Sequence, residues 1–210
     1  MAKARNKIVY QFRIELNEIK PLIWRQIQVP ASYNFWDLHV AIQDSMGWLD
    51  YHLHAFRIRM PHKKKMIEIG IPDEEFDSRN VLPGWEISIT EYFTQPGDSA
   101  VYEYDFGDCW HHNVLLEAIL LKEKGVKYPK CIAGERACPP EDCGGVPGYY
   151  ELLEVIENPS DPEYEEIVAW LKGHAKNYFP YDPDAFKPEQ LKFWNPKKRW
   201  QVAFSEAGQR

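Results

Sequence analysis

Residues 8–30 read IVYQFRIELNEIKPLIWRQIQVP, and this stretch decides the fold. Apolar side chains occupy every second position of its first half: Ile8, Tyr10, Phe12, Ile14 and Leu16. A period of two is typical of a half-buried β-strand. After a turn at 17–21, a second run at 22–29 places Ile23, Ile27 and Val29 on the same face as Arg25. We therefore predict a β-hairpin over these residues.

The period changes to that of a helix after residue 31. Apolar residues then recur at spacings of three and four: Phe35, Leu38, Ile42, Met46 and Leu49. Ser32 or Asn34 is the expected N-terminal cap, and Gly47 is expected to end the helix. A third strand follows at 53–60, and weaker alternation predicts short strands at 66–71 and 85–89.

The second half begins with another predicted hairpin, formed by strands at 101–106 and 110–121 around the turn Gly107-Asp108. Residues 128–147 are rich in proline, glycine and cysteine, which indicates an irregular loop of about 20 residues. Two amphipathic helices are expected at 148–158 and 162–172.

This order of elements favours an α+β fold over a doubly wound parallel sheet. We predict a largely antiparallel or mixed β-sheet, with one early helix and two or three C-terminal helices packed on it. We expect residues 1–210 to form a single domain, with the aromatic tail 175–210 packed on it.

Composition narrows the classes of function. The 210 residues are 44% hydrophobic and 14% aromatic, enough for a core and too many for a disordered chain. No apolar run approaches the roughly 20 residues of a membrane span, and no signal-peptide block follows the start. We therefore expect a cytoplasmic protein with no membrane partner. A net charge of −7 disfavours extended nucleic-acid binding.

Several blocks of sequence carry a resemblance to a known family. They are PLIWRQIQVP (21–30), DLHVAIQDSMGW (37–48), GWLDYHLHAF (47–56), YEYDFGDCWHH (102–112) and CPPEDCGGVPGYYELL (138–153). In these blocks and their order, the chain resembles the plasmid Ri ORF-three-like family, also described as transposon-passenger TnpR-like proteins. The resemblance implies an α+β fold found in single-domain proteins of prokaryotes and mobile elements, and it implies no reaction, substrate or cofactor. Recombinase activity is not carried over, because the chain has neither a serine-recombinase pattern nor a helix-turn-helix tail.

A zinc site is the first candidate constellation. Cys131, Cys138 and Cys143 lie in one loop, and zinc prefers four thiolate or imidazole ligands. His111, His112 or Cys109 on the preceding hairpin could supply the fourth ligand. The alternatives are buried thiols that act as small hydrophobic residues, and a reactive thiol.

Carboxylates beside glycines are the second candidate. The acids Asp105, Asp108, Glu141 and Asp142 lie in YDFGD and PPEDCGG, and with a nearby histidine they could bind a hard cation or act as acid and base. Alternatively, these carboxylates accept local backbone hydrogen bonds in turns. Gly144-Gly145 before a helix could form an anion-binding nest, although a simple turn is favoured.

Single residues on strands give two further hypotheses. Arg25 on an apolar face needs a carboxylate or carbonyl partner, and Asp105 is the candidate for a structural ion pair. Alternatively, Arg25 recognises an anion in a cleft. His52 and His54 share one face of the third strand, a spacing that could hold a metal, although satisfied core histidines are the favoured interpretation.

Charge is segregated along the chain. Residues 56–67 contain five basic and no acidic side chains, whereas 135–166 contain ten acids and one arginine. A basic hairpin tip with Lys63, Lys64 and Lys65 could contact nucleic acid, or it could protect an edge strand from aggregation.

We therefore weigh three functions. The first is a non-enzymatic binding or accessory module of the mobile-element passenger type, with a protein or small ligand as partner. The alternatives are a metal-assisted hydrolase using the YDFGD and PPEDCGG loops, and a nucleic-acid-contacting accessory protein. Most of these site hypotheses depend on the loop 131–145 lying beside the turn 105–112.

Overall fold

The computed structural model describes residues 7–59, 65–72 and 81–204. These residues form one eight-stranded sheet with the order β5-β4-β3-β6-β7-β1-β2-β8. The strands are β1 (Ile8–Leu16), β2 (Trp24–Pro30), β3 (His54–Arg59), β4 (Met66–Gly70), β5 (Val81–Pro83), β6 (Ser99–Tyr104), β7 (Trp110–Leu121) and β8 (Lys130–Glu135). The β4–β5 pair is parallel and the other neighbours are antiparallel, so the predicted α+β class with a mixed sheet is confirmed.

The hairpin at 8–30 forms as predicted, with Phe12 opposite Ile27 in an antiparallel register. Phe12 and Ile14 are fully buried on the face that packs into the core. On the opposite face, Gln11 donates a hydrogen bond to Glu117 at 3.1 Å. One apolar and one polar face explain the alternation, because an antiparallel sheet can be covered on one side only.

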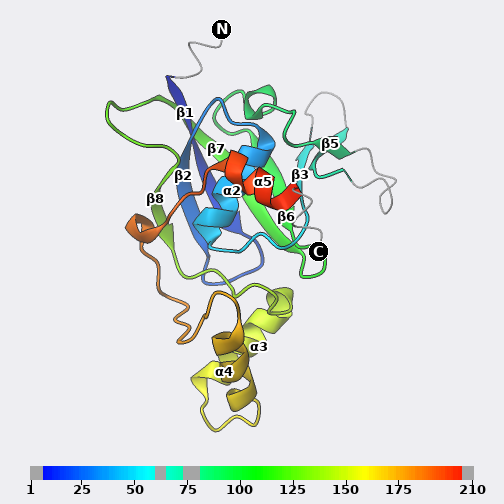
Figure 1. Ribbon diagram of the computed structural model, residues 1–210, viewed down its shortest axis with the longest axis vertical. Coiled ribbons are helices and arrows are strands. Elements are labelled where there is room, and N and C mark those ends of the chain that lie inside the picture. The colour runs from blue at the N-terminus through cyan, green and yellow to red at the C-terminus, as the bar shows by residue number, and fades with distance from the viewer. Residues whose placement is uncertain (1–6, 60–64, 73–80, 205–210) are drawn as a thin grey trace.

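Helix α2 (Phe35–Met46) crosses the covered face of the sheet (Figure 1). Asn34 caps it through a capping box with Asp37, and Gly47 ends it at a φ of 90°. Both expectations for the ends of this helix are confirmed. A left-handed backbone at Gly47 is the reason that a glycine follows the last turn.

The remaining helices belong to the second half of the chain, and the first of them adds Tyr149 to the core. They are α3 (Gly145–Glu157), α4 (Tyr164–Gly173) and α5 (Pro196–Phe204), with short 3₁₀ turns η1 (Ile89–Glu91) and η2 (Pro188–Gln190). Figure 1 shows α5 against α2, and α3 with α4 as a pair beyond one end of the sheet. No helix within the described ranges is both long and apolar enough to cross a bilayer.

Two expected elements differ from the structure. Residues 128–147 are not wholly irregular, because β8 adds to the edge of β2 within them. The expected strand at 85–89 is wrong: the strand is β5, and Ser88 makes only an isolated bridge with Asn34. The physical reason is that the chain turns at Gly84, which accepts a hydrogen bond from Trp36 N, so the next residues cover the start of α2.

Candidate metal centre

Three segments that are distant in sequence meet at the end of the sheet nearest to α3. They are the loop after α2, the turn between β6 and β7, and the loop before α3. Asp105 N donates to Leu53 O at 3.0 Å, and Gly144 N donates to Asp108 Oδ2 at 3.2 Å. A side chain at Gly145 would meet Asp108 O at 2.6 Å, so the two loops lie in direct contact. The structure thus places the regions 131–145 and 105–112 side by side.

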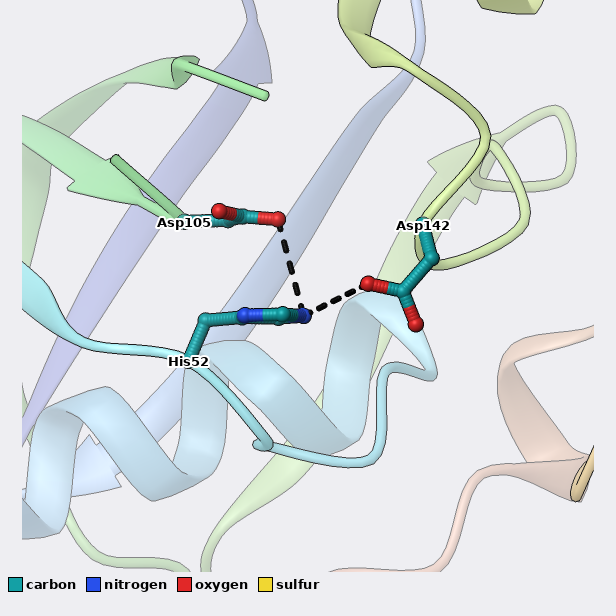
Figure 2. A group of neighbouring side chains, drawn as sticks. All are labelled: His52, Asp105 and Asp142. Atoms are coloured by element: carbon teal, nitrogen blue, oxygen red, sulfur yellow. Dashed lines mark hydrogen bonds and ion pairs between the residues drawn. The ribbon is translucent and has the colours of Figure 1, made fainter. Parts of the chain in front are cut away.

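A histidine and two carboxylates converge at this junction. His52 Nε2 lies 2.7 Å from Asp142 Oδ1 and 3.5 Å from Asp105 Oδ2. Figure 2 shows the imidazole edge pointing between the two acids, which come from different segments. One ligand atom of each residue lies within 4.8 Å of the other two. We call His52, Asp105 and Asp142 the acidic cluster.

Asp105 is held rigidly by its own turn. Its Oδ1 accepts hydrogen bonds from Gly107 N at 2.9 Å and Asp108 N at 3.3 Å, which leaves Oδ2 directed at His52. Asp105 has a φ of 57° and Asp142 a φ of 62°, in the left-handed region that aspartate tolerates better than most side chains. Strained backbone of this kind concentrates at functional sites.

His174, directly after α4, supports Asp142 from the opposite side. Its Nδ1 accepts a hydrogen bond from Lys176 N at 3.2 Å, so a neutral ring carries its proton on Nε2. That Nε2 lies 3.9 Å from Asp142 Oδ2. His174 in this tautomer has no free Nε2 lone pair for a metal, and it acts as a positioning residue.

Glu141 and Asp108, two of the predicted acids, do not join the acidic cluster. Glu141 is 1% exposed and accepts hydrogen bonds from Leu49 N at 2.7 Å and from the Tyr104 hydroxyl. Burial and this carboxylate raise the pKa of Tyr104. Asp108 accepts from the Gly144 N–H, which occupies a donor of the suggested anion nest. Both acids therefore hold loops together.

The predicted thiol-rich zinc set is not formed. In the described part of the chain, the acidic cluster is the only group of three or more potential ligands that share one position. The Cys131 thiol donates to Ala133 O at 3.2 Å, and the Cys109 thiol donates to Phe106 O at 3.4 Å. Burial raises the pKa of Cys138 to about 12 and also raises that of Cys143, which keeps both as thiols rather than reactive thiolates.

The predicted histidine ligands also point elsewhere. His111 and His112 are neighbours on β7, so their side chains lie on opposite faces of the sheet. His111 Nε2 lies 3.7 Å from Glu103, whereas His112 is fully buried against Trp48. Burial lowers the pKa of His112 to about 3. Neither histidine forms a group of three potential ligands with the cysteines in the described residues.

His52 and His54 do not form a metal pair. His54 begins β3 and stacks on His39 in the core, with the two ring centroids 3.5 Å apart. Burial lowers the pKa of His54 well below its ordinary value. His52 precedes the strand and faces the acids instead, so the two histidines have separate roles.

Arg25 is not paired with Asp105. Its guanidinium donates to three backbone carbonyls, each at 2.8 Å: Ser45 O, Trp24 O and Glu135 O. No carboxylate of residues 7–59, 65–72 or 81–204 lies within ion-pair distance of it. The end of α2, the edge strand β8 and β2 itself each supply one of these carbonyls, so the predicted ion pair is replaced by neutral acceptors.

The predicted basic hairpin tip at residues 63–65 lies mostly outside the described residues. Lys63 and Lys64 lie outside the described residues, and Lys65 is exposed. His174 and Lys176 lie outside every motif of the sequence, so no role was predicted for either residue. The only signal for His174 was its position directly after a predicted helix.

The fold and the cluster together define a class: a mixed-sheet α+β protein with a histidine–carboxylate site carried on loops at one end of the sheet. The model of the plasmid pRiA4b ORF-3-like proteins matches residues 8–190, and the chain belongs to this family. The predicted membership of the plasmid Ri ORF-three-like family is thereby confirmed.

Two relatives show how far the similarity extends. The chain is 31% identical to uncharacterized protein y4hQ of Sinorhizobium fredii (strain NBRC 101917 / NGR234) over 163 residues, 77% of this chain and 80% of the relative. It is also similar to the crystal structure of a protein of unknown function, MM3350, from Methanosarcina mazei Go1. That match has a TM-score of 0.78 and 41% identity, and it covers 89% of this chain and 99% of the other.

Proposed function

We propose that the chain is a binding module that holds a divalent cation in the acidic cluster. The observation that carries this proposal is the convergence of one imidazole nitrogen and two carboxylates from three segments. Imidazole with carboxylates suits Zn²⁺ and Mn²⁺, and such a mixed set favours transition ions over Ca²⁺. The proposal replaces the thiol ligands expected for zinc by His52, Asp105 and Asp142.

The donor distances fit such an ion after a small adjustment. Ligands about 2.0–2.2 Å from a zinc ion lie about 3.3–3.6 Å from each other in a tetrahedron. His52 and Asp105 are already 3.5 Å apart. The 2.7 Å contact between His52 and Asp142 must open by less than about 1 Å to reach this spacing. Asp142 is the most exposed of the three, with 46% of its side chain accessible, so it can make this movement.

The electrostatic surroundings support cation binding. A cavity of about 260 Å³ adjoins Asp142, and three further acids line it: Glu151, Glu163 and Glu166. Carboxylates lining a concave surface raise the local concentration of cations. Exposed Tyr51 and Leu53 flank His52 in sequence, and they offer apolar surface beside the ion for a ligand that completes its coordination.

This binding role is the proposed activity of a non-enzymatic, cytoplasmic module of the mobile-element passenger type. Its partner would be a small ligand or a protein that presents an oxygen donor to the ion. Nucleic acid is disfavoured as the partner, because the acids around Asp142 would repel its phosphates.

A metal-assisted hydrolase is the second candidate, and one observation favours it. The two loops expected to form a single hydrolytic site each supply one carboxylate to the acidic cluster. Part of His52 and Asp142 is exposed, so an ion there would keep positions open for water. A bound ion would then lower the pKa of that water and generate a nucleophile.

Metal titration tests the first proposal. The full-length chain, treated with EDTA and dialysed, is titrated with Mn²⁺ while electron paramagnetic resonance reports the free ion, because Mn²⁺ binds thiols poorly. We expect one site, with binding lost in Asp105→Asn and His52→Ala. Asp161→Asn and His111→Ala are the matched controls and should bind as the parent does. Equal binding by parent and Asp105→Asn would overturn the site.

A hydrolysis panel separates the two functions. The Zn²⁺-loaded chain is assayed on phosphatase, esterase, nuclease and peptidase substrates. Turnover that disappears in Asp142→Asn, with the fold unchanged by circular dichroism, would favour the hydrolase. Metal binding without turnover supports the binding module.

A further inference from the structure

A separate cavity of about 450 Å³ lies between the end of α2, the residues before α3 and the C-terminal tail. Its lining includes Arg25, Cys138, Lys176, Tyr178, Phe186 and Leu191. We call it the cationic cavity. It does not include any member of the acidic cluster.

Arg25 brings a buried charge without a carboxylate partner to this cavity. The side chain is 2% exposed, and its Nε and Nη1 atoms donate to the three carbonyls described above. Nη2 has no hydrogen-bond acceptor among the described residues. A buried charge is costly unless an opposite charge accompanies it. The ring of Phe186 lies 3.9 Å from the guanidinium carbon and compensates only in part.

Lys176 adds a second positive charge. Its ammonium donates to Gly47 O at the end of α2, and desolvation of this ammonium lowers its pKa, while the residue as a whole is exposed. The carboxyl end of a helix supplies only about half a negative charge. The positive charges of Arg25 and Lys176 together therefore exceed the partial negative charge at the end of α2. At the rim, Lys187 and Asp182 offset each other.

The remainder of the lining is apolar or uncharged. Leu191, Pro180, Met46 and Ala185 contribute hydrocarbon surface, and the Tyr178 hydroxyl accepts a hydrogen bond from Glu141 N at 3.2 Å. The proton of that hydroxyl has no acceptor in the described part of the chain, so it can be donated to a ligand.

We propose that the cationic cavity binds a small organic carboxylate, with its charged group at Arg25 and Lys176 and its apolar body against Leu191. A carboxylate fits better than a phosphate, because one free Nη2 and one ammonium match a single negative charge. This site lies on a chain of net charge −7, so its positive lining is a local exception that selects for an anion.

Ligand titration tests this proposal independently of the metal. The full-length chain in EDTA is titrated with sodium benzoate at constant ionic strength and observed by saturation-transfer NMR. Benzamide, acetate and inorganic phosphate serve as probes that lack the charge, the apolar body and the carboxylate, respectively. We expect saturable binding of benzoate at millimolar concentration or below, and at least about fivefold weaker binding of each of the other three.

Two variants locate the site. Lys176→Gln should weaken benzoate binding at least about fivefold, because it removes a charge-assisted hydrogen bond. Lys172→Gln, an exposed change on α4 outside the cavity, should leave binding unchanged. The proposal is overturned by any of the following: absence of saturable benzoate binding, equal binding of benzamide, tighter binding of phosphate, or equal losses in the two variants.

Discussion

The acidic cluster and the cationic cavity share two short segments of chain and yet have opposite character. Residues 138–142 supply Cys138 to the cavity and Asp142 to the cluster. Residues 174–176 supply Lys176 to the cavity and place His174 beside Asp142 of the cluster. The cluster lies on loops and is partly exposed, whereas Arg25 in the cavity is bonded to backbone of β2, β8 and α2. Substitutions in the cavity should therefore cost stability, and those in the cluster should cost ligand affinity.

The largest expected effect is that of Arg25→Met. The change removes all three hydrogen bonds from the guanidinium to backbone carbonyls, one of them buried and two partly buried, and we expect the free energy of unfolding to fall by about 3–5 kcal/mol. Urea denaturation followed by circular dichroism measures it. His52→Ala in the cluster is the comparison and should change stability by less than about 0.5 kcal/mol. Similar losses in the two variants would contradict the division between the regions.

Acid should destabilise the core of the protein, which contrasts with the partly exposed cluster in containing buried, neutral histidines. The folded-state pKa of His112 is lowered to about 3, whereas the unfolded chain takes up the proton near its ordinary value of 6.5. Protonation therefore favours the unfolded state as the pH falls through 6.5, and stability is lost at about 1.4 kcal/mol per pH unit for each such histidine.

The contribution of His112 is isolated by a variant. His112→Phe keeps the aromatic contacts with Trp48 and Tyr102 but removes the titrating ring. Its stability relative to the parent should increase by about 2–3 kcal/mol between pH 6.5 and pH 4.5, measured by urea denaturation. Taking the difference between variant and parent cancels the contributions of Asp37 and Asp44, because their raised pKa values act in the opposite direction equally in both proteins. A difference that does not depend on pH would refute the assignment.

The sequence predicts the strands and helix ends better than the contacts at the two sites, because only the former depend on local signals. Alternation from Ile8 to Leu16 and the caps Asn34 and Gly47 are local signals, and the structure follows them closely. A carbonyl partner for Arg25 was among the expectations, but the carbonyls themselves could not be named and Asp105 was the wrong candidate, because backbone carbonyls have no signature in a sequence. His52 and Asp142 are ninety positions apart, and only the contact between the two loops joins them.

A smaller loss of folding stability is expected when Phe186 is displaced from Arg25. A methyl group at Gly134 would lie 2.5 Å from the Phe186 ring and 2.7 Å from Trp24 O. Gly134→Ala should therefore destabilise the fold by about 1–3 kcal/mol and weaken benzoate binding in the cationic cavity. The acidic cluster should bind Mn²⁺ unchanged in this variant, which calorimetry of both ligands on one sample would establish. A parallel loss at both sites would show that the two regions are one cooperative unit.

The smallest expected effect concerns His174, which touches the cluster only through Asp142. His174→Ala removes a donor 3.9 Å from Asp142 Oδ2, and we expect Mn²⁺ affinity to fall about fivefold, or about 1 kcal/mol. Stability should fall by about 1 kcal/mol, because the imidazole is 8% exposed and contacts the rings of Trp170 and Tyr178. His174→Gln restores a donor and should recover part of the affinity. Complete loss of Mn²⁺ binding in both variants would instead make His174 a direct ligand, in the other tautomer, and would extend the cluster to four residues.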